Sequence, residues 1–398
     1  MPERWDVVVA GGGTAGLTAA RSAALEGGKV LLLEMGARIG SSAQLASLIP
    51  ADVDFPGKRQ AVHPLRQVEL HAPHRELRVK CNRAMIVDQR RLAENLAAEV
   101  AENRGEIWLN APVKGLLVED GAVRGVHLEA GGWSENIRCE VVIDATGARG
   151  EMSGLFLREV LKTGWNRELL AFSNEYLMAN AGEGKADLFF DSYVAPGGHA
   201  WVYPLAKGFA ASGIFGLRIH PDAALDEFLG RKRIEGLAQA MPIAATRGQL
   251  PLEGPLSRTC ADGIIAVGGA AGHIYPLSGQ GLLYSLRCGE IAGRVAIEAV
   301  TEGDVAQKRL SDYERIWRSE FDRDFEIAGA LQSSLSVFQD QKMDTIVATL
   351  EGKPSLQRAF IDLWYGFRPE SSMKRLLQDG EISKILGGGT AAEPARRR

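Results

Sequence analysis

A glycine-rich turn near the start of the chain constrains its fold more than any other feature. The apolar run Trp5–Ala10 reads as a strand and leads directly into Gly11-Gly12-Gly13-Thr14-Ala15-Gly16, after which small and apolar residues continue at helical spacing. A Gly-x-Gly-x-x-Gly turn between a strand and a helix is the fingerprint of a dinucleotide-binding βαβ unit. Gly11 permits the tight turn, Gly13 lets backbone N–H groups reach a pyrophosphate, and Gly16 lets the helix pack close to the strand.

The second strand of this unit carries the acidic residue that the fingerprint requires. Val30–Leu33 is a continuous apolar run, as expected of a strand buried on both faces, and Glu34 follows it. A carboxylate at that point accepts hydrogen bonds from the ribose hydroxyls of an unphosphorylated adenosine. The motif alone does not choose between NAD and FAD, and a glycine-rich turn without a ligand is the alternative. Because strand, helix, second strand and acid occur in order, we expect a nucleotide site.

Charge and composition exclude several classes of partner. The chain has 398 residues, 45% of them hydrophobic, with 46 Lys and Arg against 50 Asp and Glu. A weakly acidic chain without a basic block is a poor candidate for binding nucleic acid. No apolar stretch approaches the ~18 residues of a membrane-spanning helix, so we expect no integral membrane segment. The chain is long enough for two domains.

Cysteine usage and the N-terminus favour a reducing compartment. The four cysteines (Cys81, Cys139, Cys260 and Cys288) are far apart and form no Cys-x-x-Cys pair, which argues against a disulfide framework or an iron–sulfur centre. Residues 1–4 lead straight into the first strand and leave no room for a signal peptide. The expected location is cytoplasmic, with contact at a membrane surface as an open alternative.

Hydrophobic patterns predict the remaining elements. We expect a helix over 90–102, a hairpin of 113–118 with 123–128 turning at Asp120-Gly121, and a strand over 139–144. Residues 35–80 read as irregular and polar. Aromatic and β-branched residues alternate with glycine and proline over 165–254, which predicts a mostly β layer. A buried strand at 263–267, a helix after residue 282 and a helical segment from 305 complete the chain.

Residues 263–293 provide the most specific signal in the chain. They read GIIAVGGAAGHIYPLSGQGLLYSLRCGEIAG and resemble the geranylgeranyl reductase family of FAD-dependent oxidoreductases, which has a glutathione-reductase-like fold. The positions that match the family pattern are Gly268, Ala270, Ala271, Gly272, Pro276, Leu277, Gly279, Gly281 and Gly289. A second resemblance is the segment Pro196–Pro204, which is similar to the family's Pro-x-x-Tyr-x-Trp-x-Phe-Pro substrate-domain pattern. The order of the parts matches over roughly residues 5–300.

This resemblance implies a fold and a division into domains. The expected fold is α/β: a Rossmann-like FAD domain of the glutathione-reductase type with an inserted antiparallel β-sheet substrate domain and a helical C-terminus. The FAD domain is expected to be discontinuous, at 1–50, 81–164 and 255–304, with the substrate domain at 165–254. The helical segment would cover 305–386, and 387–398 would form a flexible tail.

The resemblance also implies which residues hold FAD. Together with the fingerprint, the expected cofactor-binding residues are Gly11, Gly13, Thr14, Ala15, Gly16, Glu34, Met35, Arg90, Val113, Ala145, Thr146, Gly147, Gly268, Gly269, Pro276, Gly279, Gly281 and Leu282. Glycines in the last segment would let the backbone pass close to the isoalloxazine ring. The helix after it would direct the positive end of its dipole at the reduced flavin.

The chain departs from the family pattern at several positions. The family's Asp after Gly268 is Gly269 here, and losing its charge-assisted hydrogen bond to the ribityl chain would weaken FAD binding by about tenfold to a hundredfold. The cysteine of archaeal members corresponds to Leu45. The usual Arg before the second helix is Gln89, with Arg90 as its expected substitute. The Tyr of the substrate segment is replaced by His199.

The implied reaction is transfer of a hydride from reduced flavin to an isoprenoid carbon–carbon double bond. Candidate catalytic residues are His273 and Tyr275, between two flavin-contacting segments, and His199 and Tyr203, on one strand face with Trp201. Structural histidines and core aromatic residues are the alternative for each. Two other functions stay open: a flavin monooxygenase or dehydrogenase of a small or aromatic substrate, and an electron-relay or degenerate flavoprotein.

The expected partners follow from this reaction. They are an apolar small-molecule substrate and an external electron donor, either NAD(P)H or a redox protein, because the chain has no second nucleotide fingerprint. No metal site is expected. His63, His71 and His74 are interpreted as solvated loop residues without acidic partners at metal-binding spacing.

Overall fold

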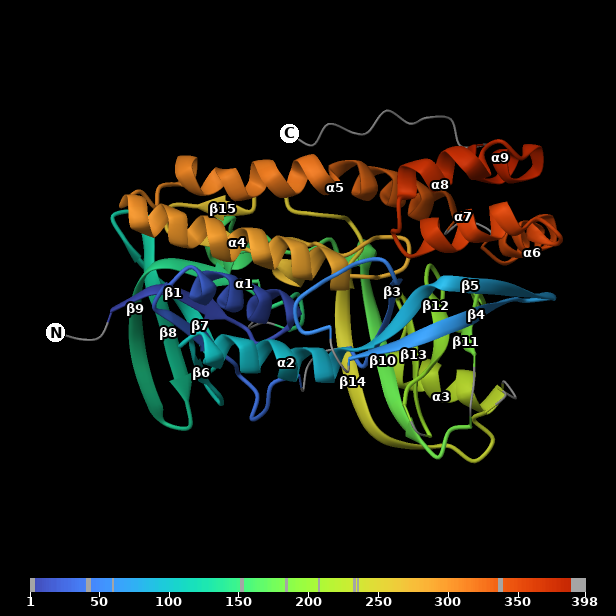
Figure 1. Cartoon of the computed structure of the whole chain (residues 1–398), viewed down its shortest axis with the longest axis horizontal. Helices are drawn as coiled ribbons and strands as arrows, with labels where there is room; N and C mark the ends of the chain where they lie inside the picture. Colours follow the sequence, from blue (N-terminus) through green and yellow to red (C-terminus); the bar gives the residue numbers. More distant parts are fainter. Residues whose placement is uncertain are drawn as a thin grey trace.

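The protein is an α/β structure with two eight-stranded sheets and a layer of helices over them (Figure 1). It was obtained as a computed structural model, in which the described residues are 4–40, 44–58, 61–150, 154–182, 185–206, 208–231, 234, 236–335 and 339–387. One sheet and the helices α1, α2 and α4 form one half of the molecule. The second sheet, α3 and the last helices form the other half.

The first sheet is built on the predicted βαβ unit. Its strands run in the order β15-β16-β9-β1-β2-β6, and the β7–β8 hairpin extends from β9. Strand β1 pairs in parallel with both β2 and β9, aligning Val8 with Leu31 and with Val142. All three side chains are fully buried, as expected of a parallel sheet covered on both faces. The strand bounds are β1 Arg4–Ala10, β2 Val30–Leu33, β6 Glu106–Trp108, β7 Val113–Glu119, β8 Ala122–Ala130, β9 Trp133–Asp144, β15 Cys260–Ala261 and β16 Ile264–Ala266.

Two helices pack against each other on one face of this sheet. They are α1 (Thr14–Leu25) and α4 (Leu282–Glu302), and α2 (Gln89–Glu102) packs beside α1. A Cβ atom on Gly289 would lie 2.5 Å from the carbonyl oxygen of Ala15, and one on Gly293 would lie 2.2 Å from that of Ala19. These two glycines therefore allow α4 to approach the backbone of α1.

The second sheet contains residues that were expected to be irregular. Its strand order is β14-β10-β13-β12-β11-β4-β5-β3, antiparallel throughout except for the parallel pair β11–β4. The expectation of an irregular segment over 35–80 is wrong, because β3, β4 and the start of β5 lie within it. The strand bounds are β3 Ala46–Pro50, β4 Val62–Ala72, β5 Arg75–Asp88, β10 Leu170–Ala179, β11 Ala186–Phe189, β12 His199–Pro204, β13 Phe209–Leu217 and β14 Met241–Pro251. Helix α3 (Pro221–Arg231) packs on β10 and β13.

The C-terminal segment is helical, as predicted, and docks on both halves of the molecule. Helix α5 (Gln307–Leu335) runs along α4, and its Tyr313 and Trp317 donate hydrogen bonds to the Ala266 carbonyl and the Thr259 hydroxyl. The last helices lie over β4 and β5 (Figure 1). They are α6 Gln339–Leu350, α7 Pro354–Trp364, α8 Pro369–Leu376 and α9 Gly380–Gly387. Nearly all of the predicted tail lies outside the described residues.

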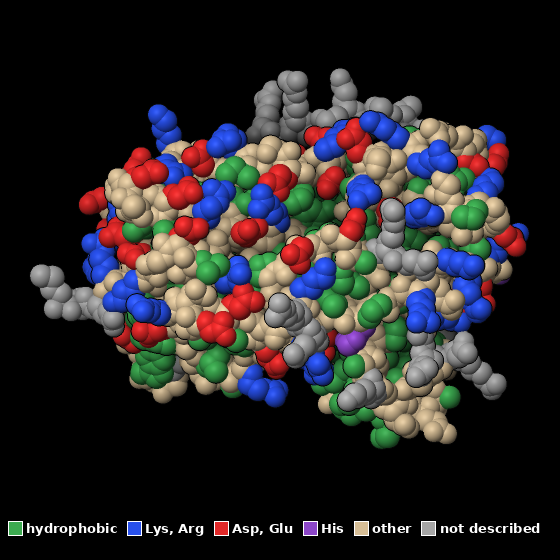
Figure 2. Space-filling view, in the orientation of Figure 1, with side chains coloured by type: hydrophobic (Ala, Val, Ile, Leu, Met, Phe, Trp, Pro, Cys, Tyr) green, Lys and Arg blue, Asp and Glu red, His purple; other side chains and the backbone are tan. Residues whose placement is uncertain are grey.

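The surface carries both signs of charge, interspersed over the face shown in Figure 2. Within the described part of the chain, no helix is long and apolar enough to cross a membrane.

Candidate functional site

The glycine turn after β1 lies against the end of β9. Gly11 has φ +111°, and a Cβ atom there would lie 2.3 Å from the carbonyl oxygen of Ala145. A Cβ atom on Gly16 would lie 2.0 Å from the carbonyl oxygen of Gly11. Both positions therefore require glycine for the close approach that the fingerprint predicts.

The middle glycine of the fingerprint, Gly13, differs from these two because it borders open space. Gly13 precedes α1, and no described atom lies within 4 Å of a Cβ atom placed on it. No side chain of the described residues caps this helix, so its first N–H groups, from Thr14, Ala15 and Gly16, lack the usual side-chain acceptor. An uncapped helix N-terminus that faces open space fits the pyrophosphate of a dinucleotide.

Glu34 is held in place by the turn that it faces. Its carboxylate accepts hydrogen bonds from Gly12 N at 2.8 Å and Gly36 N at 2.7 Å, and the residue is 4% exposed. Its carbonyl accepts a hydrogen bond from Ala111 N, two residues before the predicted contact Val113. Met35, the next predicted contact, is 66% exposed. Each carboxylate oxygen keeps a further lone pair for a ribose hydroxyl.

Two further predicted segments converge on this turn. Ala145 N donates to Ala10 O, and the Thr146 hydroxyl donates to Asp144 and accepts from Gly154 N, which fixes this loop. Gly268 has φ +60°, and a Cβ atom on it would lie 2.7 Å from that of Ala15. The structure therefore brings together the glycine turn, Glu34 and two loops, 145–147 and 268–269, as one cradle.

Gly269, where the family has Asp, lies beside Gly147. A Cβ atom at Gly269 would lie 3.4 Å from the Cα atom of Gly147 and 3.5 Å from Ala148 N, both of which are ordinary contacts. The backbone of Gly269 is outside the left-handed region, in contrast to that of Gly268. The cradle therefore has room for a Cβ atom at this position, so contact with a Cβ atom does not explain the glycine.

The turn before α4 joins the first half of the molecule to the second sheet. Tyr275 N donates to Gln280 O, and Gln280 Nε2 donates to Leu48 O on β3. Pro276 and Leu282 are buried, Gly279 has φ +69°, and no described side chain caps α4 at Gly281. A small cavity of about 20 Å³ lies beside this turn, lined by residues that include His199, Trp201, Tyr203, Gly279 and Tyr365.

Two polar atoms of this inner pocket have no hydrogen-bond partner among the described residues. They are Nδ1 of His199 and the hydroxyl oxygen of Ser278, in residues that are 2% and 7% exposed. Burial lowers the pKa of His199 to about 3, so its imidazole is neutral at neutral pH. Buried polar groups without partners are rare in proteins. These two atoms are therefore available to a ligand or a water molecule.

Two of the four predicted catalytic side chains lie away from this pocket. His273 is fully buried and packs against Trp317 and Phe325 of α5, with ring centroids 4.7 Å and 6.4 Å away. Burial lowers the pKa of His273 to about 3. The hydroxyl group of Tyr275 donates to Leu363 O at 2.9 Å. This geometry favours His199 and Tyr203 over His273 and Tyr275 as the residues that meet a substrate.

Arg90 was expected to replace the family arginine, but it lies in different surroundings from Gln89, which occupies the family position. Gln89, at the family position, is buried, and its Nε2 donates to the hydroxyl group of Ser47 in the inner pocket wall. Arg90 lines a separate cleft beside Gly40. Arg90 is therefore on a different face of α2 from the residue that it was expected to replace.

Sequence reasoning missed Glu175, a buried carboxyl group behind the inner pocket. It lies on β10, is 1% exposed, and accepts hydrogen bonds from Trp201 Nε1 at 2.9 Å and from Leu45 N. Burial raises the pKa of Glu175 to about 7, although these donors act in the opposite direction. The segment around it gives no signal, because its partners lie far along the chain.

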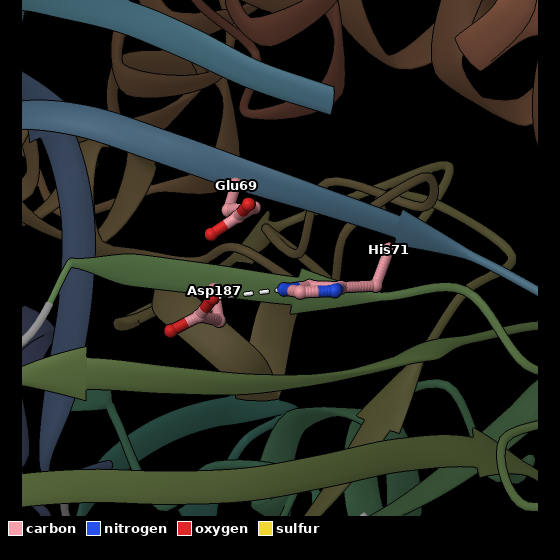
Figure 3. Close-up of side chains that lie close together, drawn as sticks. All are labelled: Glu69, His71 and Asp187. Atoms are coloured by element: carbon pink, nitrogen blue, oxygen red, sulfur yellow. Dashed lines mark hydrogen bonds and ion pairs between the residues drawn. The ribbon is translucent and has the colours of Figure 1, made fainter. Parts of the chain in front are cut away.

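The interpretation of His63, His71 and His74 as solvated loop residues is wrong for His63 and His71, which lie on β4, and right for His74, which lies in the turn after β4 with a side chain that is 83% exposed. His71 and His74 both have acidic partners, which were not expected. The Nε2 atom of His71 lies 2.8 Å from Asp187 (Figure 3). Its Nδ1 atom lies 3.1 Å from Glu76. Glu69, His71 and Asp187 offer ligand atoms within 4.8 Å of one another. Lys185 already forms an ion pair with Glu69, so we assign no metal to this cluster. His74 contacts Asp344 of α6.

Comparison with known proteins agrees with this geometry. The model of the FAD dependent oxidoreductase family matches residues 6–152. The chain is 32% identical to digeranylgeranylglycerophospholipid reductase 2 of Methanothermobacter thermautotrophicus, over 94% of this chain and 99% of the relative. It has a TM-score of 0.82 at 23% identity with a geranylgeranyl bacteriochlorophyll reductase-like protein of Thermoplasma acidophilum, covering 97% and 99% of the two chains. A flavin-dependent brominase has a TM-score of 0.68 at 13% identity, covering 97% and 98%.

Sequence identity over nearly the full length of both chains establishes the relationship. The likeness includes the cradle at the N-terminus of α1, which fits a dinucleotide. The two solved structures show that the same fold extends through both halves of the chain. The chain belongs to the geranylgeranyl reductase family of FAD-dependent oxidoreductases.

Proposed function

We propose that this enzyme reduces carbon–carbon double bonds in the isoprenoid chains of a lipid, with an FAD domain of the glutathione-reductase type. The observation that carries the proposal is the junction between the cradle and the inner pocket. The turn 275–280 borders the pocket, and Gln280 contacts β3 of the second sheet. The names of the relatives support an isoprenoid lipid as the substrate.

The residues of the cradle would hold FAD. The uncapped N-terminus of α1 would bind the pyrophosphate, and Glu34 would bind the adenosine ribose. Gly268, Gly269 and the turn before α4 would contact the remainder of the cofactor. Reduced FAD supplies a hydride when it is bound.

The aromatic residues of the pocket would exclude water and orient the alkene. His199, with its neutral imidazole, would place no charge beside the apolar chain. Burial raises the pKa of Tyr203, whose hydroxyl group therefore stays protonated and would hold the proton that the second carbon of the alkene needs. A cavity of about 20 Å³ is too small for an isoprenoid chain, so these side chains must move when substrate enters.

The proposed reaction also indicates an electron donor and a cellular location for the enzyme. The described residues contain one Gly-x-Gly-x-x-Gly turn, which supports transient reduction by NAD(P)H or by a redox protein. Because an isoprenoid lipid resides in a membrane, such a substrate favours action of the enzyme at a membrane surface. Both are parts of the proposal.

The test is an anaerobic single-turnover reaction. Protein loaded with FAD is reduced with dithionite and mixed with an unsaturated digeranylgeranylglyceryl phosphate, and the lipid is analysed by mass spectrometry. We expect two hydrogens to be added per reduced double bond and the flavin to be reoxidised. Flavin that stays reduced, or a lipid that gains oxygen when air is admitted, would overturn the proposal. The variant Tyr203→Phe, which lacks the proposed proton carrier, should slow the reduction without releasing FAD.

A further inference from the structure

A second and much larger cleft lies between the two halves of the molecule. Its volume is about 720 Å³. One side consists of the loop 37–40 and the first turn of α2, and the other consists of β10, β14 and the turn between β12 and β13. Figure 2 shows the outline of the molecule indented at its lower edge, between the half that carries α2 and the half that carries β14.

One side of this cleft carries three arginines and two carboxylates, those of Asp88 and Glu94. Arg90 and Arg91 line it from α2, and Arg38 lines it from the loop. Asp88 also lines the cleft and is the N-cap of α2, accepting from Arg90 N and Arg91 N. Its carboxylate oxygens lie 3.9 Å from Arg90 Nε and 3.6 Å from Arg91 Nε, so it forms ion pairs with both arginines. The Nε atom of Arg90 is buried and has no hydrogen-bond partner in the described part of the chain. Three guanidinium groups against two carboxylates leave this side with a net positive charge, which favours an anionic ligand.

The other side of the cleft is apolar and opens to solvent. Leu177 and Leu205 lie in its wall, and three large hydrophobic side chains line the cleft at the surface, of which Leu109, directly after β6, comes from the first side. These are Leu109, Phe209 and Ile243, which are 42%, 39% and 58% exposed. Large exposed apolar patches are uncommon on monomeric proteins and usually mark a binding site.

The cleft is adjacent to the inner pocket but distinct from the cradle. Glu175 and Leu177 are two residues apart on β10, so they share a face of the sheet about 7 Å apart. Glu175 contacts Trp201 of the inner pocket, and Leu177 lines the cleft. No residue of the turn 11–16 or of the loops 145–147 and 268–269 lines the cleft.

We infer that this cleft binds the anionic head and the first isoprenoid units of an amphiphilic substrate. A phosphate would bind to Arg90 and Arg91, and the chain would lie along the apolar wall toward the inner pocket. The volume of the cleft is typical of sites for organic ligands, whereas that of the inner pocket is not. This inference rests on the proposed function, because it takes a lipid as the substrate.

The test measures binding to the FAD-loaded enzyme and needs no turnover. The probes are diphytanylglyceryl phosphate, whose chains are already saturated, and the same lipid without phosphate. We expect wild type to prefer the phosphate lipid, and Arg91→Gln to reduce that preference about tenfold or more. Ile243→Asn should weaken binding of both lipids. Arg315→Gln, on the exposed surface of α5, is the matched control and should change neither.

The outcomes separate the sources of the anion. Inorganic phosphate alone should bind more weakly than the lipid, because it lacks the apolar contacts; equal binding would overturn the lipid assignment. Lipid affinity that is unchanged in Arg91→Gln, or undetectable in wild type, would also overturn it. Loss of FAD in place of lipid would assign the cleft to the cofactor. If the saturated lipid binds as expected but the unsaturated lipid is not reduced, the proposed reaction is contradicted and the proposed binding site is retained.

Discussion

The hydroxyl groups of Tyr203 and Tyr365 lie 2.5 Å apart, although the residues are separated by 162 positions in the sequence. Tyr203 is on β12 of the second sheet, and Tyr365 directly follows α7 of the C-terminal segment. Both residues line the inner pocket and both are buried. The C-terminal helices, which match no family pattern that could be identified in the sequence, therefore complete one wall of the candidate active site.

Replacing either tyrosine should leave its partner without a hydrogen bond. We expect Tyr203→Phe and Tyr365→Phe each to lower the free energy of unfolding by about 1–3 kcal/mol, because a buried hydroxyl group loses its partner. The double variant should lose clearly less than the sum of the two. Urea unfolding of the four proteins measures this coupling, and purely additive effects would contradict it.

The βαβ unit and the cradle could be predicted because their signals are local. The glycine spacing at 11–16 requires a specific turn, and Val30–Leu33 is apolar throughout because both faces of the strand are covered. The turn Asp120-Gly121 likewise joins the hairpin β7–β8 at the expected position. In each case the residues that determine the structure are neighbours in the sequence.

The second sheet and the pocket could be predicted only in part. Charged residues recur through β4 and β5, and β4 pairs with β11, which lies about a hundred residues further on. Glu175 is buried because Leu45 and Trp201 donate to it, and neither neighbours it in sequence. His273 was expected near the flavin because it lies between two segments that match the family's flavin contacts, and its packing against Trp317 of α5 could not be read from that local pattern.

Gly269→Asp should strengthen FAD binding. The family has Asp at this position, the backbone conformation is ordinary, and the nearest atoms are 3.4 Å or more from the added Cβ. We expect at least about tenfold tighter FAD, measured by titrating the apoprotein and following flavin fluorescence. The free energy of unfolding of the apoprotein should change little.

The neighbouring glycine provides the control for this prediction. Gly268→Ala places a Cβ atom 2.7 Å from that of Ala15 at φ +60°, so it should destabilise the fold and reduce FAD binding. If Gly269→Asp behaves in the same way, the cradle has no room for the family's carboxylate.

Glu175 should make the folded state less stable as the pH rises. The pKa of Glu175 is raised to about 7 from its usual 4.5, chiefly by burial. The folded protein therefore holds this proton more tightly than the unfolded chain, and stability falls between pH 4.5 and about 7. The total effect is about 3 kcal/mol. Glu175→Gln is neutral at every pH and has one acceptor oxygen in place of two, so it should be less stable than wild type at pH 5. Its stability should not fall between pH 5 and pH 8, whereas that of wild type should.

Urea unfolding at pH 5 and pH 8 checks this difference. The exposed substitution Glu135→Gln serves as the control and should follow wild type at both pH values. Parallel pH dependence in wild type and Glu175→Gln would show that Glu175 is ionised across this range.

His71 should act in a different pH range, through the contacts that join β4 to β5 and β11. Burial on its own lowers the pKa of His71, but hydrogen bonds to Asp187 and Glu76 outweigh it and raise the pKa. The charged imidazole therefore stabilises the fold fully below its unfolded pKa of about 6.5, and this contribution is lost as the pH rises through the folded value. We expect His71→Gln to cost about 1–2 kcal/mol at pH 6 and clearly less at pH 9. His74→Gln, at a side chain that is 83% exposed, should cost little at either pH. A cost for His71→Gln that is equal at pH 6 and pH 9 would mean that the neutral imidazole alone provides these contacts.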